Sequence, residues 1–201
     1  MPFVFKRLAL LMSIAAAFAA DKEPKDATFK PPSPDSMAHH ETNEQVTIGA
    51  DAYTSTAQAK TAFGKLDPNQ HGILPVLVAV RNDSTKTIDA SRLEVQYIGP
   101  GHVRVDNTPA ADVKFVRGVK PPGYIPGPTG GIAVLRGKKN PLDVWEIEGH
   151  AFAAKMILPG QTASGFFYFQ ADLKPGATIY LNGLAEAGGG KELFYFEIPL
   201  E

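Results

Sequence analysis

The chain has 201 residues, no cysteine, one tryptophan and almost no net charge, because 20 Lys and Arg face 21 Asp and Glu. Without cysteine it forms no disulfide, thiolate zinc site or iron–sulfur cluster, and it has no cysteine nucleophile. A formal charge of −1 lacks the basic excess of proteins that bind nucleic acid over a whole surface, so we expect no nucleic-acid partner. Hydrophobic residues still make up 44%, which is enough for the core of one domain.

Long apolar runs are also rare, and the clearest one is at the N-terminus. Lys6 and Arg7 precede an apolar run over 8–18, and the sequence Ala-Phe-Ala over 17–19 matches the pattern of a cleavage site. The run has about half of the roughly 20 residues that a membrane-spanning helix needs. We therefore interpret 1–19 as a secretory signal peptide of bacterial type. It predicts a periplasmic or extracellular protein with no membrane span after cleavage.

The segment 20–45 is rich in proline and charge and poor in large apolar side chains. Such a segment buries too little apolar surface to offset the entropy lost on ordering. It predicts a flexible tail that leads into one domain over 46–201. Because no disulfide holds that domain together, its hydrophobic core must do so.

Short apolar segments alternate with turn residues through the rest of the chain. A β-branched segment over 74–81 ends at the turn 82–84, and the segment 92–98 alternates apolar and polar residues. Further strands are expected at 102–105, 151–158, 164–170, 177–182 and 192–199. This spacing predicts an antiparallel sandwich or barrel. The segments 165–169 and 193–198 are apolar on both faces, which predicts two central strands.

One segment interrupts the strand pattern. Residues 51–63 are rich in alanine, contain no proline or glycine and stop at Gly64, which predicts a short helix that packs Tyr53 and Phe63 against a sheet edge. The expected core residues are the inward side chains of the strands: Val76, Val78, Val80, Leu93, Val95, Tyr97, Phe167, Phe169, Ile179, Leu181, Phe194, Phe196 and Ile198.

A long loop over 118–143 has glycine or proline at 11 of its 26 positions. Loops of this length in compact domains are usually functional or disordered. Between 114 and 139 there are six basic residues and no acidic one: Lys114, Arg117, Lys120, Arg136, Lys138 and Lys139. If they converge in space, they predict a surface for an anionic polymer, phospholipid headgroups or an acidic partner; if not, they are scattered solubilising residues. Tyr124 either stacks on a sugar or partner or folds back onto the sandwich.

No motif for catalysis stands out. A phosphate-binding loop and a G-x-S-x-G elbow are both absent from the sequence. The adjacent His39 and His40 lie in the expected tail, which offers no preorganised frame, so we predict no metal site and no cofactor. Glu146 and Glu148 alternate with apolar residues on an expected strand over 144–148. That spacing puts both carboxylates on one face, an arrangement compatible with a glycosidase.

Three segments together resemble the immunoglobulin-like accessory domains of exported bacterial proteins: Pro-Val-Leu-Val-Ala-Val-Arg-Asn-Asp-Ser over 75–84, Leu-Pro-Gly-Gln-Thr-Ala-Ser-Gly-Phe-Phe-Tyr-Phe over 158–169, and the final Phe-Tyr-Phe-Glu-Ile strand. The shared motifs are an Asn-containing turn after a strand and a Pro-Gly turn before an aromatic strand. The resemblance covers about 46–199. It implies a mainly β fold, an antiparallel Ig-like β-sandwich, here with one short helix and a long Gly/Pro-rich loop, and it implies no reaction.

The leading hypothesis is a non-catalytic exported binding or scaffolding module that contacts an envelope component or a protein partner through the basic loop 114–139. The predicted contact residues are Tyr124, Arg136, Lys138, Lys139, Arg117 and Lys120. One alternative is a secreted hydrolase of envelope polysaccharide with Glu146 or Glu148 as acid or base. Another is a structural subunit that pairs with a second chain through a strand edge.

Overall fold

A computed structural model describes residues 29–116, 124–126, 132–134 and 140–200 of the chain. The expected signal peptide over 1–19 lies outside these residues, as does most of the long loop over 118–143. Within the described residues, no helix combines the length and the apolar character needed to cross a membrane.

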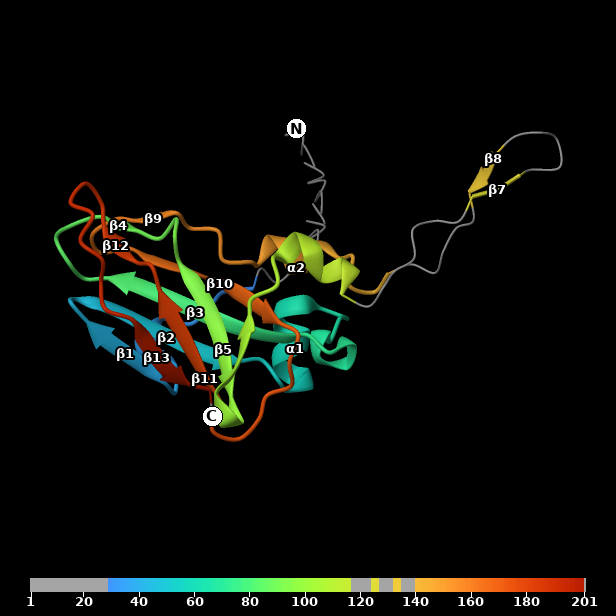
Figure 1. Cartoon of the computed structure of the whole chain (residues 1–201), viewed down its shortest axis with the longest axis horizontal. Helices are drawn as coiled ribbons and strands as arrows, with labels where there is room; N and C mark the ends of the chain where they lie inside the picture. Colours follow the sequence, from blue (N-terminus) through green and yellow to red (C-terminus); the bar gives the residue numbers. More distant parts are fainter. Residues whose placement is uncertain (1–28, 117–123, 127–131, 135–139, 201) are drawn as a thin grey trace, which may run out of the picture.

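The fold is mainly β, with antiparallel sheets and few helices, and it resembles a β-sandwich (Figure 1). Sheet I has the order β1 (His40–Asn43), β2 (Val46–Ala52), β3 (Leu74–Asn82), β10 (Thr162–Phe169). Sheet II has the order β13 (Phe196–Pro199), β11 (Thr178–Asn182), β5 (Glu94–Gly99), β6 (Val103–Asp106). Two smaller sheets pair β12 (Ala185–Glu186), β4 (Ile88–Asp89) and β9 (Met156–Ile157), and β7 (Tyr124–Pro126) with β8 (Ile132–Val134). The helices are α1 (Thr56–Phe63) and α2 (Trp145–Gly149), with 3-10 helices at Pro34–Ser36, Pro68–His71, Pro100–His102 and Ala110–Phe115.

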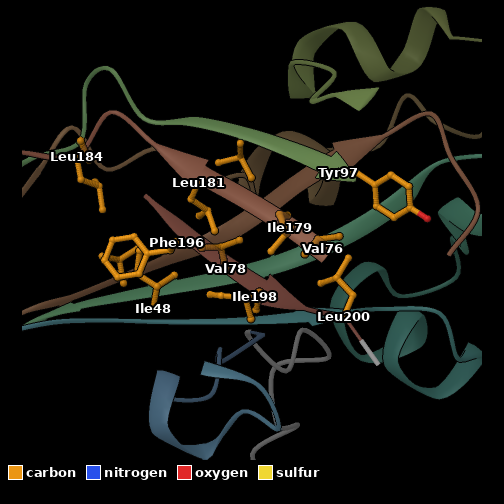
Figure 2. Packing of buried hydrophobic residues seen from close by; sticks show 14 of the residues in the cluster. Ile48, Val76, Val78, Tyr97, Ile179, Leu181, Leu184, Phe196, Ile198 and Leu200 are labelled. Carbon is orange, nitrogen blue, oxygen red and sulfur yellow. The ribbon is translucent and has the colours of Figure 1, made fainter. Parts of the chain in front are cut away.

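The main core lies between sheets I and II, where alternate side chains of facing strands meet (Figure 2). Val76 and Val78 of β3 are completely buried, as are Ile179 and Leu181 of β11. Each such side chain contributes about 1.5–3 kcal/mol by leaving water. All but one of the predicted core residues are confirmed, with Leu93 and Phe167 partly buried against the core. The exception is Phe194. Phe194 is 65% exposed, because it precedes β13 and does not face the opposite sheet.

A second hydrophobic cluster covers the other face of sheet I. Leu77 of β3 and Phe166 and Tyr168 of β10 point away from the main core and contact Phe63 of α1 and Ile147 of α2 within this cluster. Strand β10 is therefore apolar on both faces although it lies at the edge of sheet I. The prediction that it is central is wrong, because helices, not further strands, bury its second face.

The segment 193–198 also differs from the prediction. Its strand, β13, is shorter than expected and lies at the edge of sheet II, not at the centre. The residues just before it, Phe194 and Tyr195, are 65% and 57% exposed. The apolar run therefore does not mark a central strand here either, because two of its large side chains remain in water.

The predicted helix is present but begins later than expected. Residues up to Ala52 complete β2, and α1 starts after Ser55, whose side chain accepts a hydrogen bond from the Gln58 backbone while the Gln58 side chain accepts one from the Ser55 backbone. This capping box satisfies donors that a helix start leaves free. Gly64 ends the helix with φ 65°. Tyr53 and Phe63 are buried, but they pack on the second face of sheet I and not against a sheet edge as predicted.

The expected flexible tail over 20–45 is wrong for its described part. Met37 is 3% exposed, and β1 pairs antiparallel with β2 through four residue pairs. Gly49 of β2 makes this possible, because a Cβ there would lie 2.7 Å from Met37 Sδ. Backbone pairing and one buried methionine thus order a segment whose composition alone predicts a tail.

Two other expected strands are short or absent in the structure. The segment 151–158 forms only the two-residue strand β9, preceded by an isolated bridge between Ala151 and Phe166. The segment 144–148 is not a strand, because Val144 is the N-cap of α2 and the next four residues lie in this helix.

Candidate functional site

The predicted basic contact surface lies almost entirely outside the described residues. The contact residues that fall outside are Arg117, Lys120, Arg136, Lys138 and Lys139. Tyr124 belongs to β7, whose backbone pairs with β8 so that Tyr124 is opposite Val134. Lys114 is described, and its Nζ lies 3.3 Å from Glu148 Oε1. The basic surface therefore stays a prediction, and one of its six cations already has a carboxylate neighbour.

The predicted carboxylate pair is not brought together. Glu146 and Glu148 lie on the helix α2, where residues two positions apart are separated by about 200° around the axis. The prediction that both face the same side is wrong, because it assumed a strand. Glu148 is instead paired with Lys114 across the surface. The geometric basis for a two-carboxylate hydrolase is thereby removed.

His40, one of the two adjacent histidines, makes a local contact. The Nδ1 atom of His40 lies 3.3 Å from the Met37 carbonyl oxygen. Within the described ranges, no three His, Asp or Glu side chains gather as a metal ion would require.

A groove of about 470 Å³ lies on the side of sheet II that faces away from the core. It is lined by Arg92, Glu94, Tyr180, Asn182, Gly183, Glu192, Leu193, Phe194 and Tyr195. The strand period explains this composition, because Ile179 and Leu181 of β11 enter the core and the alternate residues Tyr180 and Asn182 point outward. The antiparallel register places Glu94 of β5 opposite Asn182.

Two tyrosines form an aromatic surface in this groove. The rings of Tyr180 and Tyr195 are stacked, with centroids 5.4 Å apart and an angle of 30° between their planes. The Arg104 guanidinium carbon lies 5.5 Å from the centroid of the Tyr180 ring, which holds that ring from the side of β6. Tyr195 and the adjacent Phe194 remain largely exposed. Large aromatic side chains grouped in water mark interaction sites more often than scattered ones do.

The polar residues of the groove include one unsatisfied atom. The Oδ1 atom of Asn182 is buried and has no hydrogen-bond partner among the described residues. Leaving such an acceptor unpaired costs about 1–3 kcal/mol. Arg92 Nη1 lies 3.6 Å from Glu192 Oε1, in a pair that is mostly exposed and therefore weak.

The end of β11 is held close to Arg92 by a glycine. Gly183 has φ +83°, and a Cβ at this position would lie 2.1 Å from the Arg92 carbonyl oxygen. Only glycine allows both the left-handed backbone and this approach. Arg92, Glu94 and Asn182 form the polar wall of the groove. Backbone packing between Gly183 and Arg92 therefore sets the position of this wall.

None of the predicted site residues lies in this groove, although the sequence carries a signal for part of it. Tyr180 occupies a polar position of an alternating strand, so an aromatic side chain is placed where solvent is expected. No comparable signal marks Tyr195, because the apolar residues around it predict burial on both faces.

Comparisons with known proteins show likeness of structure only. No family model matches the chain, and no curated protein matches it. Three similar solved structures are a candidate lipoprotein of Bacillus subtilis (12% identity, TM-score 0.37, covering 79% of this chain), a functionally unknown protein of Listeria monocytogenes (12%, 0.32, 81%) and an uncharacterised β-sandwich protein of Clostridium difficile (10%, 0.29, 87%). The chain spans 37%, 82% and 99% of their respective lengths. The expected resemblance to uncharacterised bacterial proteins is confirmed at this low level of sequence identity.

Proposed function

We propose that this protein is an exported, non-catalytic binding module that contacts an envelope component through the groove on sheet II. The observation that supports this proposal is the stacked pair of Tyr180 and Tyr195 beside the exposed Phe194. Burial of such side chains by a partner recovers hydrophobic free energy that folding has left unused. Tyrosine loses few rotamers on binding, which makes it a favourable contact residue.

The groove is built on a rigid frame. Tyr180 and Asn182 belong to β11, which is hydrogen-bonded to β13 on one side and to β5 on the other. The backbone of a central strand changes position little when a ligand arrives, so binding has a small ordering cost.

We include an Ig-like topology in the proposal. Strands β2, β3 and β10 follow the neighbour order of strands A, B and E in Ig domains, and β13, β11 and β5 follow that of G, F and C. Strand β6 adds to the second sheet beside β5, as an extra strand does in variable-type domains.

The basic loop 114–139 is a second proposed contact region, supported by the charge pattern of the sequence. Arg136, Lys138 and Lys139 are the residues to change, because a triple substitution to Glu leaves three cations and three carboxylates and so cancels the local charge. Contacts through this loop would weaken steeply with salt, whereas contacts through the aromatic groove would not. Salt dependence therefore separates the two regions.

The test of the groove is co-sedimentation of residues 20–201 with the insoluble envelope fraction of the source organism. We expect the wild-type protein to sediment with this fraction, and the double substitution Tyr180→Ala and Tyr195→Ala to reduce the bound fraction at least tenfold. Trp145→Ala is the matched control, because Trp145 is an exposed aromatic residue (71%) that lies outside both the groove and the basic loop 114–139. Equal sedimentation of the double variant and the wild type would overturn the proposed role of the groove.

Export is tested separately by expression of the full chain. The proposed cleavage gives a mature protein that begins at Ala20 and is found outside the cytoplasm. A protein that retains residues 1–19 in the cytoplasm would overturn this part of the proposal.

A further inference from the structure

We infer that the groove on sheet II binds a neutral saccharide, with a sugar ring packed on the tyrosine pair and its hydroxyl groups on Asn182 and Glu94. This inference rests on the proposed binding function and specifies its ligand. Three properties of the groove lead to it: its aromatic surface, its charges of both signs and its unpaired acceptor.

The aromatic surface selects for a flat apolar face. Tyr180 and Tyr195 are stacked with an angle of 30° between their planes, and Tyr195 is 57% exposed. The C–H face of a sugar ring is flat and weakly positive, and it packs on the negative face of an aromatic ring. The groove volume of about 470 Å³ falls within the range of about 300–1,000 Å³ that is usual for small-ligand sites.

The groove carries charges of both signs. Its lining includes the guanidinium group of Arg92 and the carboxylates of Glu94 and Glu192, and the Arg104 guanidinium lies beside Tyr180. Arg92 is already close to Glu192. An anionic polymer would meet two carboxylates, and a cationic one would meet two guanidinium groups. A ligand without charge avoids both penalties while offering hydrogen bonds to each group.

The unpaired acceptor requires a donor from the ligand. Asn182 Oδ1 is covered by protein atoms and has no partner within the described part of the chain, so the amide must turn toward the groove as the ligand enters. A sugar hydroxyl both donates and accepts, which suits the amide of Asn182 and the carboxylate of Glu94 opposite it. An apolar peptide side chain would leave the acceptor unpaired.

The first experiment identifies the chemistry of the ligand by competition. Envelope material is separated into a neutral oligosaccharide fraction, a charged oligosaccharide fraction and a protease-released peptide fraction, and each is added to the co-sedimentation assay. We expect the neutral fraction alone to release the protein. If the charged fraction or the peptides release the protein while sedimentation still depends on Tyr180 and Tyr195, the ligand is not a neutral saccharide. The inference is then overturned, and the proposed function stays intact. Sedimentation that does not depend on the tyrosines would overturn both.

The second experiment tests the named residues with the neutral oligosaccharides that compete. Titration followed by NMR chemical shifts should give at least a tenfold weaker affinity for Tyr195→Ala and for Asn182→Leu, and an unchanged affinity for Trp145→Ala. Asn182→Leu discriminates between roles, because a merely structural asparagine with an unpaired oxygen would be replaced by leucine without loss of affinity or stability. Affinity unchanged in Asn182→Leu and Tyr195→Ala would overturn the inference.

Discussion

Asn82, at the end of β3, should be the most important polar side chain for the stability of this domain. It is completely buried, with 0% exposure. Its Nδ2 donates to the carbonyl oxygens of Lys86 at 2.7 Å and Ile157 at 2.9 Å. Its Oδ1 accepts from the Ser84 backbone N–H at 3.0 Å and the Ser84 hydroxyl at 2.6 Å. The amide thus uses both donors and its acceptor to connect the turn after β3 with strand β9.

Replacement of Asn82 by alanine takes the amide away from a buried carbonyl, that of Ile157, and from partly buried groups of Ser84 and Lys86, although the Lys86 carbonyl still accepts from the Ser84 hydroxyl. A hydrogen bond contributes about 0.5–1.5 kcal/mol on balance, and a buried group left unpaired costs about 1–3 kcal/mol. Because two carbonyls and one backbone N–H lose this partner together, we expect Asn82→Ala to lower the free energy of unfolding by about 3–5 kcal/mol. That is a large share of the about 5–15 kcal/mol that holds a typical domain folded.

Urea unfolding followed by circular dichroism measures this loss. The midpoint should fall while the slope stays the same, because the surface exposed on unfolding does not change. The melting temperature should fall by roughly 6–20 °C, since each kcal/mol corresponds to about 2–4 °C for a chain of this size. Gln161→Ala is the matched control: its side chain is exposed, and only its backbone oxygen accepts a bond from Asn82. The control should stay within about 0.5 kcal/mol of the wild type.

The variant Asn82→Asp adds a pH-dependent check. It keeps an acceptor for Ser84 but turns a carboxylate oxygen toward the carbonyls of Lys86 and Ile157. Burial without a cation raises the pKa of the introduced acid in the folded state, so the variant loses stability relative to the wild type as pH rises through that pKa. If Asn82→Ala and Gln161→Ala unfold at the same urea concentration, or if Asn82→Asp shows no such pH dependence, the reasoning about this buried network is refuted.

Three further predictions concern backbone contacts, ionisation and a helix cap. Gly165→Ala should lower the free energy of unfolding in urea by about 3 kcal/mol, because the added Cβ would lie 2.4 Å from the backbone N and Cα of Phe152. Gly160→Ala is the comparison: with φ +73° and no atom within 4 Å, it should lower the free energy of unfolding by only about 1–2 kcal/mol. Burial and, second, the negative charge of Asp51 raise the pKa of Tyr53 to about 12, so the stability of the neutral phenol is fully present below pH 10 and is lost as pH rises from about 10 to 12. Tyr53→Phe should therefore reduce the fall in unfolding free energy between pH 10 and 12, and an unchanged fall would contradict the assigned environment. Ser55→Ala should lower stability by about 1 kcal/mol through loss of the capping box, and an effect below about 0.3 kcal/mol would show that the cap contributes little.

The sequence predicts the strands whose alternation is regular. Strands β3, β5 and β11 lie within a residue or two of the expected positions, and Val76, Val95 and Ile179 are buried as expected. The reason is local: in a strand, successive side chains point to opposite faces, so a period of two specifies which residues share a face. The helix end at Gly64 was also predictable, because glycine adopts the required positive φ at low cost.

The same reasoning fails where burial depends on an element far away in the sequence. The residues of β10 are apolar on both faces whether strands or helices cover the second face, and only the packing of Phe63 and Ile147 decides between them. The segment over 29–45 has the composition of a tail, yet pairing of β1 with β2 and the space above Gly49 order it. These outcomes depend on contacts between distant residues, which composition and period do not describe.

The candidate site shows the same division. Sequence alone determines that Tyr180 faces away from the core side chains Ile179 and Leu181, because the alternation of β11 requires it. Only the tertiary structure brings Tyr195 against that ring, and only the close approach of Gly183 to Arg92 sets the polar wall beside it. Local period determines the face that each side chain takes, whereas long-range packing decides which faces are covered and which remain open to a ligand.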